Sequence, residues 1–302
     1  MSMLEDLSKA TAEAVEMGGR SLVRVEGRRR LPASGIAWSE DGIIVTAHHV
    51  LERDDEIGVG LPDGTHAEAA VVGRDPSTDL AVVRLKGSRL QAPSWAGSGT
   101  ARVGHLVLAL GRPGERTLAT LGVVSALGDA WRTPAGGGID RFFQTDVVMY
   151  PGFSGGLLID ASGKGLGLNT SGLARGLSLT IPVETLRRTV EMLLKHGRVR
   201  RGYLGVGAQT VRLPESAGGQ ATGLMLASVE PGSPADRAGL VLGDVLLSLD
   251  GVRLEGMEDL LNALGPDRVG KSVALELLRG GQPKSVSVEI GERDSTRDER
   301  PE

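Results

Sequence analysis

The stretch Pro-Gly-Phe-Ser-Gly-Gly-Leu-Leu-Ile-Asp at positions 151–160 is the most informative part of the sequence for the fold. Its glycines flank Ser154 and permit a tight turn, and the four residues from Leu157 onward have the apolar character of a short strand. Ser162 and Gly163 then predict a further turn. A serine that precedes a strand argues against the nucleophile elbow of α/β-hydrolases, in which a helix follows the serine.

Short apolar runs continue on both sides of this turn. Most are bounded by Gly, Pro, Asp or Ser, and they lie at 22–25, 43–45, 70–72, 80–85, 106–110 and 121–124. We expect no helix of about twelve residues between them, so the pattern predicts a barrel or sandwich of short strands instead of a doubly wound sheet. Glycine supplies 45 of the 302 residues, which fits a chain with many tight turns.

Two helices are predicted beside these strands. Apolar residues recur at helical spacing over 4–17, before Gly18-Gly19 ends the pattern. The second helix covers 183–196, with Pro182 as a tolerated first residue, an apolar stripe, and Gly197 beyond its end.

A second compact pattern follows these elements. It contains strands, a helix near 257–264 and a hairpin at Gly280-Gly281. We predict five regions, which are a helical segment at 1–20, a β domain at 21–197, a linker at 198–202, a smaller domain at 203–291 and a charged, disordered tail at 292–302.

Composition excludes several classes of function. The net charge of −4 argues against a nucleic-acid partner, and the absence of cysteine excludes disulfides and thiolate nucleophiles. No run approaches the ~18 apolar residues of a membrane helix, and charges near the N-terminus exclude a secretory signal. The chain as written is expected to be cytoplasmic, or extracytoplasmic if a targeting segment was removed. We predict no cofactor and no metal, since His66 and His105 lie in no ligand-spaced motif.

Three short segments carry candidate chemistry. Thr46-Ala47-His48-His49-Val50 ends one strand, Ser77-Thr78-Asp79-Leu80-Ala81-Val82 opens another, and Ser154 lies in the glycine-rich turn. Acyl transfer needs a hydroxyl nucleophile, an imidazole base and a carboxylate that fixes the imidazole tautomer. Each segment alone is unspecific, but the order His49, Asp79, Ser154 is that of chymotrypsin-type enzymes. The N–H groups of Gly152 and Ser154 are then the candidate oxyanion donors.

Two features invite other interpretations. Neighbouring residues on a strand face opposite sides, so only one of His48 and His49 is expected to face the cleft, and the motif selects His49. The basic runs 28–30 and 198–201 are interpreted as solvated turn and linker charges, with phosphate binding as the alternative.

Further motifs extend the pattern over nearly the whole chain. They are Gln144-Thr145-Asp146, Leu168-Asn169-Thr170, Leu179-Thr180-Ile181-Pro182 and Arg201-Gly202-Tyr203-Leu204-Gly205-Val206. Together with the three segments above, they make the sequence resemble the HtrA/Deg family of trypsin-like serine proteases with one C-terminal PDZ domain. The resemblance implies a mainly β fold, with a chymotrypsin-like double β-barrel followed by a small α+β PDZ domain. It also implies His49 as general base, Asp79 as its orienting carboxylate and Ser154 as nucleophile.

The resemblance also indicates two binding regions. The residue six before the nucleophile, Val148, is expected at the bottom of the primary substrate pocket. The far wall is expected to come from Leu177, Ser178 and Leu179, so an uncharged pocket predicts cleavage after Val, Ala or Leu. In the second domain, a peptide carboxylate is expected at Tyr203, Leu204, Gly205 and Val206, beside a groove walled by Leu261 or Leu264.

The sequence departs from the family pattern at two positions beside the nucleophile. Relatives usually have Asn where Phe153 stands and Pro where Leu157 stands. The N-terminal segment also lacks the aromatic residues with which many relatives form trimers.

The resemblance implies a serine endopeptidase of protein quality control. It is expected to degrade unfolded or damaged proteins, with C-terminal peptides bound at the PDZ domain, as a homo-oligomer with a multiple of three subunits. The alternative is a weakly active or inactive peptide-binding scaffold or chaperone with the same fold.

Overall fold

A computed structural model describes residues 2–87, 89–174, 176–200, 202–213 and 220–292. The chain divides into two compact units, residues 1–199 and 200–302. The division falls within the interval 198–202, and the finer domain boundaries remain predictions. Apart from Glu292, the expected disordered tail lies outside the described residues.

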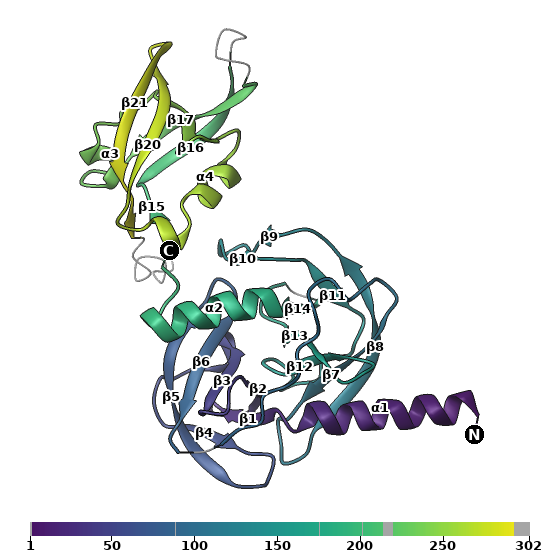
Figure 1. The fold of residues 1–302 in the computed structure, drawn as a ribbon. Coiled ribbons are helices and arrows are strands. Elements are labelled where there is room, and N and C mark those ends of the chain that lie inside the picture. Colours follow the sequence, from purple (N-terminus) through teal and green to yellow (C-terminus); the bar gives the residue numbers. More distant parts are fainter. Residues whose placement is uncertain (1, 88, 175, 201, 214–219, 293–302) are drawn as a thin grey trace. The chain divides into compact units, whose positions relative to one another are not determined.

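The first unit contains two closed six-stranded antiparallel barrels (Figure 1). The first follows the order β1-β2-β3-β6-β5-β4 and consists of β1 (Leu22–Glu26), β2 (Ala33–Ala37), β3 (Ile43–Ala47), β4 (Ile57–Gly60), β5 (His66–Asp75) and β6 (Leu80–Leu85). The second follows β11-β14-β13-β12-β7-β8 and consists of β7 (Leu106–Gly111), β8 (Leu118–Leu127), β11 (Phe143–Thr145), β12 (Leu157–Asp160), β13 (Gly165–Thr170) and β14 (Ser178–Pro182). A separate hairpin joins β9 (Trp131–Arg132) to β10 (Gly138–Ile139). The double-barrel fold is confirmed.

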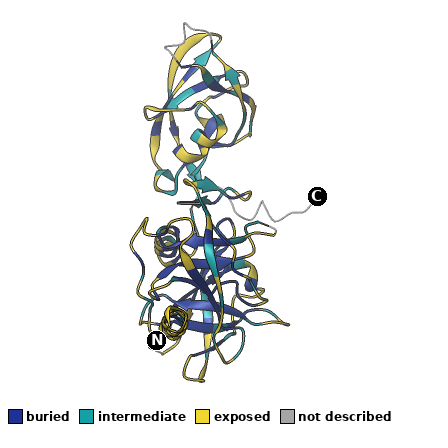
Figure 2. Ribbon diagram, turned by 90° about the vertical axis from the view of Figure 1, so that its right-hand side faces the viewer, coloured by how far each residue is buried: buried dark blue, intermediate teal, exposed yellow. Residues whose placement is uncertain are grey.

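The strands read as continuous apolar runs because many of them are buried on both faces. In β3, Ile44 faces the interior of the first barrel, whereas Ile43 and Val45 belong to a core cluster that also includes Leu157 of β12. Side chains alternate along a strand, so one strand serves both cores. Figure 2 shows many of these strands as buried over most of their length. The core shared by the two barrels holds them together at the candidate site.

Two helices accompany the barrels. Helix α2 (Val183–His196) matches the prediction and ends at Gly197 in the left-handed conformation, with φ 71°. Pro182, expected as its first residue, is instead the N-cap. Helix α1 (Met3–Gly19) continues through the glycines that were expected to end it. A Cβ on Gly18 would lie 2.7 Å from Leu110 Cδ1, so this glycine permits close packing on the second barrel instead of ending the helix.

The second unit is a small α+β domain built on the sheet order β16-β17-β18-β20-β21. Its elements are β15 (Gly202–Tyr203), β16 (Val206–Arg212), β17 (Thr222–Val229), α3 (Pro234–Arg237), β18 (Val245–Leu249), β19 (Val252–Arg253), α4 (Met257–Ala263), β20 (Ser272–Arg279), β21 (Gln282–Glu289) and β22 (Gly291–Glu292). The predicted hairpin at Gly280-Gly281 is confirmed, with φ values of 57° and 81°. None of the helices in the described ranges is long and apolar enough to cross a bilayer.

Candidate active site

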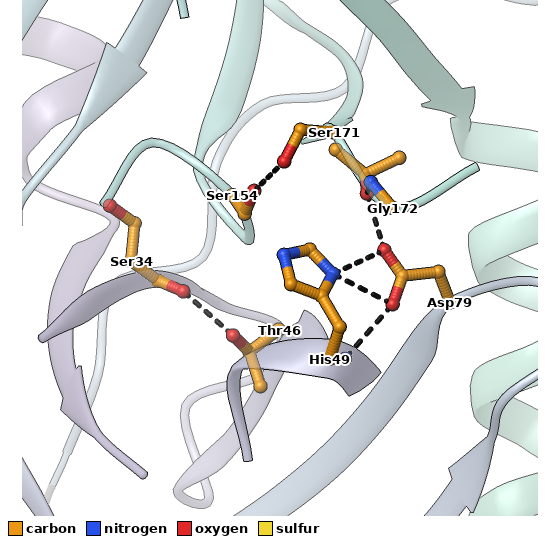
Figure 3. A network of polar contacts seen from close by, with 8 residues as sticks. Ser34, Thr46, His49, Asp79, Ser154, Ser171 and Gly172 are labelled. Carbon is orange, nitrogen blue, oxygen red and sulfur yellow. Dashed lines mark hydrogen bonds and ion pairs between the residues drawn. The ribbon is translucent and has the colours of Figure 1, made fainter. Parts of the chain in front are cut away.

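His49 and Asp79 approach each other at one end of the first barrel. His49 lies in a 3-10 turn, η1 (His48–Val50), directly after β3, and Asp79 lies just before β6. His49 Nδ1 is 2.8 Å from Asp79 Oδ2 and 3.0 Å from Oδ1. A carboxylate only accepts hydrogen bonds, so Nδ1 carries the proton and Nε2 of the neutral ring is left as an acceptor. Figure 3 shows the imidazole between Asp79 and the loop that carries Ser154.

Asp79 is held by more than the imidazole. Its carboxylate also accepts hydrogen bonds from the His49 backbone N–H, at 3.0 Å, and from the Thr170 hydroxyl. Its backbone is left-handed, with φ 56°, a conformation that aspartate adopts more readily than most residues. The side chain is only 5% exposed. These contacts fix the carboxylate, which in turn orients the ring of His49.

Gly172 closes the site over the His49–Asp79 pair. A Cβ at this position would lie 2.5 Å from Asp79 Oδ2 and 2.7 Å from His49 Nδ1, which is closer than real Cβ contacts. Its N–H donates to the Thr170 hydroxyl at 2.9 Å. Sequence reasoning assigned no role to Thr170 or Gly172, although Thr170 belongs to a segment that carried the resemblance.

Ser154 lies on the loop before β12, with its side chain turned toward Ser171. The two hydroxyl oxygens are 3.1 Å apart, and among the described residues no hydrogen bond joins Ser154 Oγ to His49 (Figure 3). Sequence reasoning did not identify Ser171. The structure therefore brings His49, Asp79 and Ser154 into one site, but the serine hydroxyl occupies an alternative hydrogen bond.

The backbone before Ser154 forms a tight turn. Phe153 N–H donates to the Tyr150 carbonyl at 3.0 Å, and Gly152 has φ 90°, as in a type II turn with glycine at the third position. In the described part of the chain, the N–H groups of Gly152 and Ser154 donate no hydrogen bond. They are free to act as a pair of oxyanion donors.

Phe153 does not obstruct this turn. Its side chain is fully buried in the second barrel, where its ring packs against Gly111 and meets Tyr150 edge-to-face at 5.8 Å between centroids. The departure from the family pattern at this position thus enlarges the hydrophobic core beneath the loop.

Ser34 of β2 joins the serine loop to the first barrel. Its hydroxyl donates to the Gly152 carbonyl at 2.6 Å and accepts from the Arg112 N–H at 2.7 Å. Its own N–H donates to the Ser154 carbonyl at 3.2 Å, and its carbonyl accepts from the Thr46 hydroxyl at 2.7 Å. Ser34 is completely buried, so it contributes to the site through the loop and not through contact with a ligand. Only the tertiary structure identifies this role.

His48 does not take part in the contact between His49 and Asp79. We expected the two histidines to lie on a strand, with side chains on opposite faces, and this expectation was wrong. The two histidines lie on a 3-10 turn, where successive side chains diverge by about 120° instead of alternating. His48 Nδ1 is buried without a hydrogen-bond partner. Burial, followed by the nearby Arg74, lowers the pKa of His48 and favours its neutral form.

A cavity of about 650 Å³ adjoins Ser154 and His49. Met149, Tyr150 and Pro151 line it on one side, and the arginine run 28–30 lines another. Those arginines were expected to be solvated turn charges; Arg29 and Arg30 are exposed, and the structure adds that the run lies beside Ser154. The arginines belong to the loop between β1 and β2. A 2.8 Å hydrogen bond from Glu52 N–H to the Gly27 carbonyl holds this loop next to the segment after η1, which carries His49.

The residues expected to form the substrate pocket do not line the cavity beside Ser154. Val148 is 55% exposed and cannot form the bottom of a pocket, because the adjacent Val147 takes the buried position in the core. Leu177, Ser178 and Leu179 do not line the cavity either. Leu177 is 39% exposed, Ser178 donates to the Val147 carbonyl, and Leu179 is buried.

The candidate peptide site of the second unit lies along β16, at one end of its sheet. Gly205 has φ 80°, and a Cβ there would collide with Ser233. The neighbouring helix α4 contacts β16 and leaves Leu261 38% exposed. Leu264 is a core residue instead, since it caps α4 and is 8% exposed. Leu204 is also buried, whereas Tyr203 and Val206 are half-buried.

Comparisons with known proteins agree with this architecture. The trypsin-like peptidase domain family matches residues 33–168, and the PDZ domain family matches residues 202–290. A curated relative, the probable periplasmic serine endoprotease DegP-like of Halomonas elongata, is 37% identical over 273 residues, which cover 87% of this chain. They cover 57% of that relative, so the chain spans little more than half of its length.

Solved structures are similar over nearly the whole chain. The HtrA-type protease AlgW with a decapeptide has a TM-score of 0.79 and 30% identity, covering 94% of this chain and 99% of that one. The serine endoprotease from Yersinia pestis has a TM-score of 0.78 and 30% identity, covering 94% and 98%. The chain therefore belongs to the HtrA, or DegP-like, family of trypsin-like serine proteases with one C-terminal PDZ domain.

Proposed function

We propose that this chain is a serine endopeptidase in which Ser154 is the nucleophile, His49 the general base and Asp79 its orienting carboxylate. The observation that carries the proposal is the His49–Asp79 pair, which leaves Nε2 as a proton acceptor beside the serine loop. Rotation of Ser154 away from Ser171 brings its Oγ to His49. The hydroxyl then loses its proton to Nε2 and attacks the peptide carbonyl.

The remaining steps use groups of the same site. The carbonyl oxygen becomes an oxyanion that accepts hydrogen bonds from the free N–H groups of Gly152 and Ser154. His49 returns its proton to the leaving amine, and the acyl-enzyme forms. Water, activated by the same imidazole, then releases the acyl group.

Unfolded or damaged proteins are the proposed substrates, and the PDZ unit is proposed to hold their C-terminal or exposed segments. An extended peptide would add as a strand to the edge of β16, with its carboxylate at the N–H groups of 203–206 and an apolar side chain against Leu261. The HtrA-type protease AlgW, to which this chain is similar in structure, was solved with a decapeptide, which supports peptide binding by this fold.

Two further parts of the proposal concern specificity and assembly. The uncharged residues Met149, Tyr150 and Pro151 line the cavity beside Ser154, so we propose cleavage after aliphatic residues such as Val, Ala or Leu. We also propose a homo-oligomer with a multiple of three subunits, which light scattering of the purified chain would measure.

A peptide-binding scaffold without protease activity is the competing function. The observation in its favour is the Ser154–Ser171 hydrogen bond, which keeps the nucleophile away from the base.

Casein digestion by the purified chain, compared with the Ser154→Ala variant, separates the two functions. We expect the substitution to lower the rate by about 10⁶-fold, the scale for loss of a triad nucleophile. Circular dichroism and binding of a peptide with a free C-terminal carboxylate should be unchanged. Equal digestion by both proteins would contradict the role of Ser154, and no digestion by the wild type would favour the scaffold.

A further inference from the structure

The candidate active site has a strongly basic border. Arg28, Arg29 and Arg30 line the cavity that contains Ser154 and His49, and Glu52 is the one carboxylate among the described residues that line it. Three guanidinium groups against one carboxylate leave a charge of +2 at the cavity, on a chain whose net charge is −4. This local reversal of sign points to a ligand with negative charge.

The three guanidinium groups have no acidic partner that would neutralise them. Arg28 Nε donates to the Leu31 carbonyl at 2.6 Å, and Glu52 accepts from the backbone N–H of Arg29 at 3.4 Å. Within the described ranges, no ion pair involves the side chains of residues 28–30, and Arg29 and Arg30 are exposed. Their charges are therefore available to a bound molecule.

The arginines lie where the part of a substrate after the scissile bond would bind. Gly152 lies on the side of Ser154 next to the arginine loop, since a Cβ on it would lie 2.9 Å from the carbonyl oxygen of Pro32, two residues after Arg30. On the other side, the Ser171 hydroxyl lies 3.1 Å from Ser154 Oγ, directly after β13, and we assign this side to the acyl half of the substrate. A peptide that crosses Ser154 would thus leave the acyl side and pass over residues 28–31.

We propose that this loop selects substrates with acidic residues in the first few positions after the scissile bond. The inference rests on the proposed function, because the scissile bond is placed by Ser154. Arginine suits this role, since its guanidinium is always charged and can bind a carboxylate through two N–H groups. Each exposed pair is weak, and two such pairs should together change affinity by about fivefold.

Binding to the Ser154→Ala protein tests the inference independently of catalysis. The probes are three fluorescein-labelled peptides, Leu-Ala-Ala-Val-Ala-Glu-Glu-Ala, its analogue with two lysines in place of the glutamates, and one with the glutamates before the valine. All three carry a C-terminal amide, which removes the carboxylate that a PDZ domain would bind. We expect the first peptide to bind about fivefold more tightly than the others at 20 mM NaCl, and the difference to shrink at 500 mM.

Substitution of the arginines provides the decisive comparison. The preference should disappear in Arg28→Gln/Arg29→Gln/Arg30→Gln, and Arg29→Gln/Arg30→Gln serves if the triple variant does not fold. A control that removes the same charge elsewhere, Arg84→Gln/Arg89→Gln/Arg187→Gln, should retain it, because these exposed residues do not line the cavity. Equal binding of the three peptides, or a preference that survives the loss of residues 28–30, would overturn the inference.

Cleavage of the same peptides by the wild-type chain distinguishes this inference from the proposed function. Cleavage of all three at equal kcat/KM would overturn the inference and leave the protease function intact. If no peptide is cut but arginine-dependent binding is seen, the protease function fails and the acidic preference stands.

Discussion

The first barrel contributes His49 and Asp79 to the site, whereas the second contributes Ser154, and the two contributions are held in different ways. Asp79 accepts hydrogen bonds from the ring and backbone of His49 and from Thr170, so both side chains are fixed. In the second barrel, the backbone around Ser154 is fixed by Ser34, but the hydroxyl is bonded to Ser171.

This difference indicates where the site still has to change before it can react. The imidazole already has the tautomer and orientation that general-base catalysis requires. In the proposed mechanism, Ser154 rotates about one side-chain bond and exchanges the Ser171 hydroxyl for His49. Four predictions test how far the two barrels differ.

Gly172→Ala should have the largest effect, because it disturbs the contribution of the first barrel. The new methyl group would lie 2.5 Å from Asp79 Oδ2 and would displace the carboxylate or the imidazole. A displacement of about 1 Å in a catalytic group costs roughly 10²-fold in rate, so kcat/KM on a fluorogenic peptide should fall at least that far.

The matched control for this substitution is Gly114→Ala. A Cβ on Gly114 would have no atom within 4 Å, and the residue has no positive φ. This control should keep wild-type activity. Normal kcat/KM in Gly172→Ala would show that the His49–Asp79 contact tolerates displacement.

Ser34→Ala should have the next largest effect, since it loosens the serine loop from the first barrel. The substitution leaves the Gly152 carbonyl and the Arg112 N–H without their 2.6 and 2.7 Å partner, inside the protein. Unsatisfied buried groups cost about 1–3 kcal/mol each, so we expect kcat to fall about tenfold and Tm to fall as well. KM should change little, because Ser34 does not line the cavity.

Val83→Ala separates this positioning effect from general destabilisation. Val83 is fully buried inside the first barrel, away from the serine loop, and its truncation should lower Tm without lowering kcat. A Ser34→Ala variant with wild-type kcat would show that the Gly152 turn holds its shape alone.

The same comparison explains what could be predicted from the sequence. The strands were predictable because burial on both faces produces apolar runs, and Ile43 and Ile44 illustrate the two cores. The candidate triad was predictable because its order along the chain is informative. The first inference depends on the local pattern of apolar residues and the second on the order of residues along the chain, and both can be read directly from the sequence.

Features that depend on contact between distant segments could not be predicted. Gly18 was interpreted as a helix end, although its function is close packing against Leu110 of the second barrel. The place of the arginine run 28–30 beside Ser154 was not predicted, because nothing in the sequence brings these two segments together. Ser34 acts across 118 positions on Gly152, and a serine in a strand gives no signal of such a role.

Ser171→Ala should have a smaller effect and the opposite sign. It removes the hydroxyl that competes with His49 for Ser154, and one such hydrogen bond contributes about 0.5–1.5 kcal/mol. We expect kcat to rise about two- to fivefold in steady-state assays with saturating peptide. Ser8→Ala, at an exposed position on α1, is the control. A fall in kcat would show instead that Ser171 assists the nucleophile.

The smallest effect concerns His48, the neighbour of His49 in η1, and appears as a pH dependence of stability. Burial, and then Arg74, lower the pKa of His48, while Asp79 and Asp75 oppose this and His49 adds to it. The unfolded chain therefore takes up the proton first, near the ordinary histidine pKa of about 6.5. The stability contributed by neutral His48 is present above that pH and is lost as the pH falls through the lower pKa of the folded state.

We expect Tm to decrease between pH 7.5 and 5, and to decrease less in His48→Gln, as measured by differential scanning calorimetry. His66→Gln, at an exposed position, should follow the wild type. An unchanged pH dependence in His48→Gln would mean that protonation of His48 does not destabilise the barrel that orients His49.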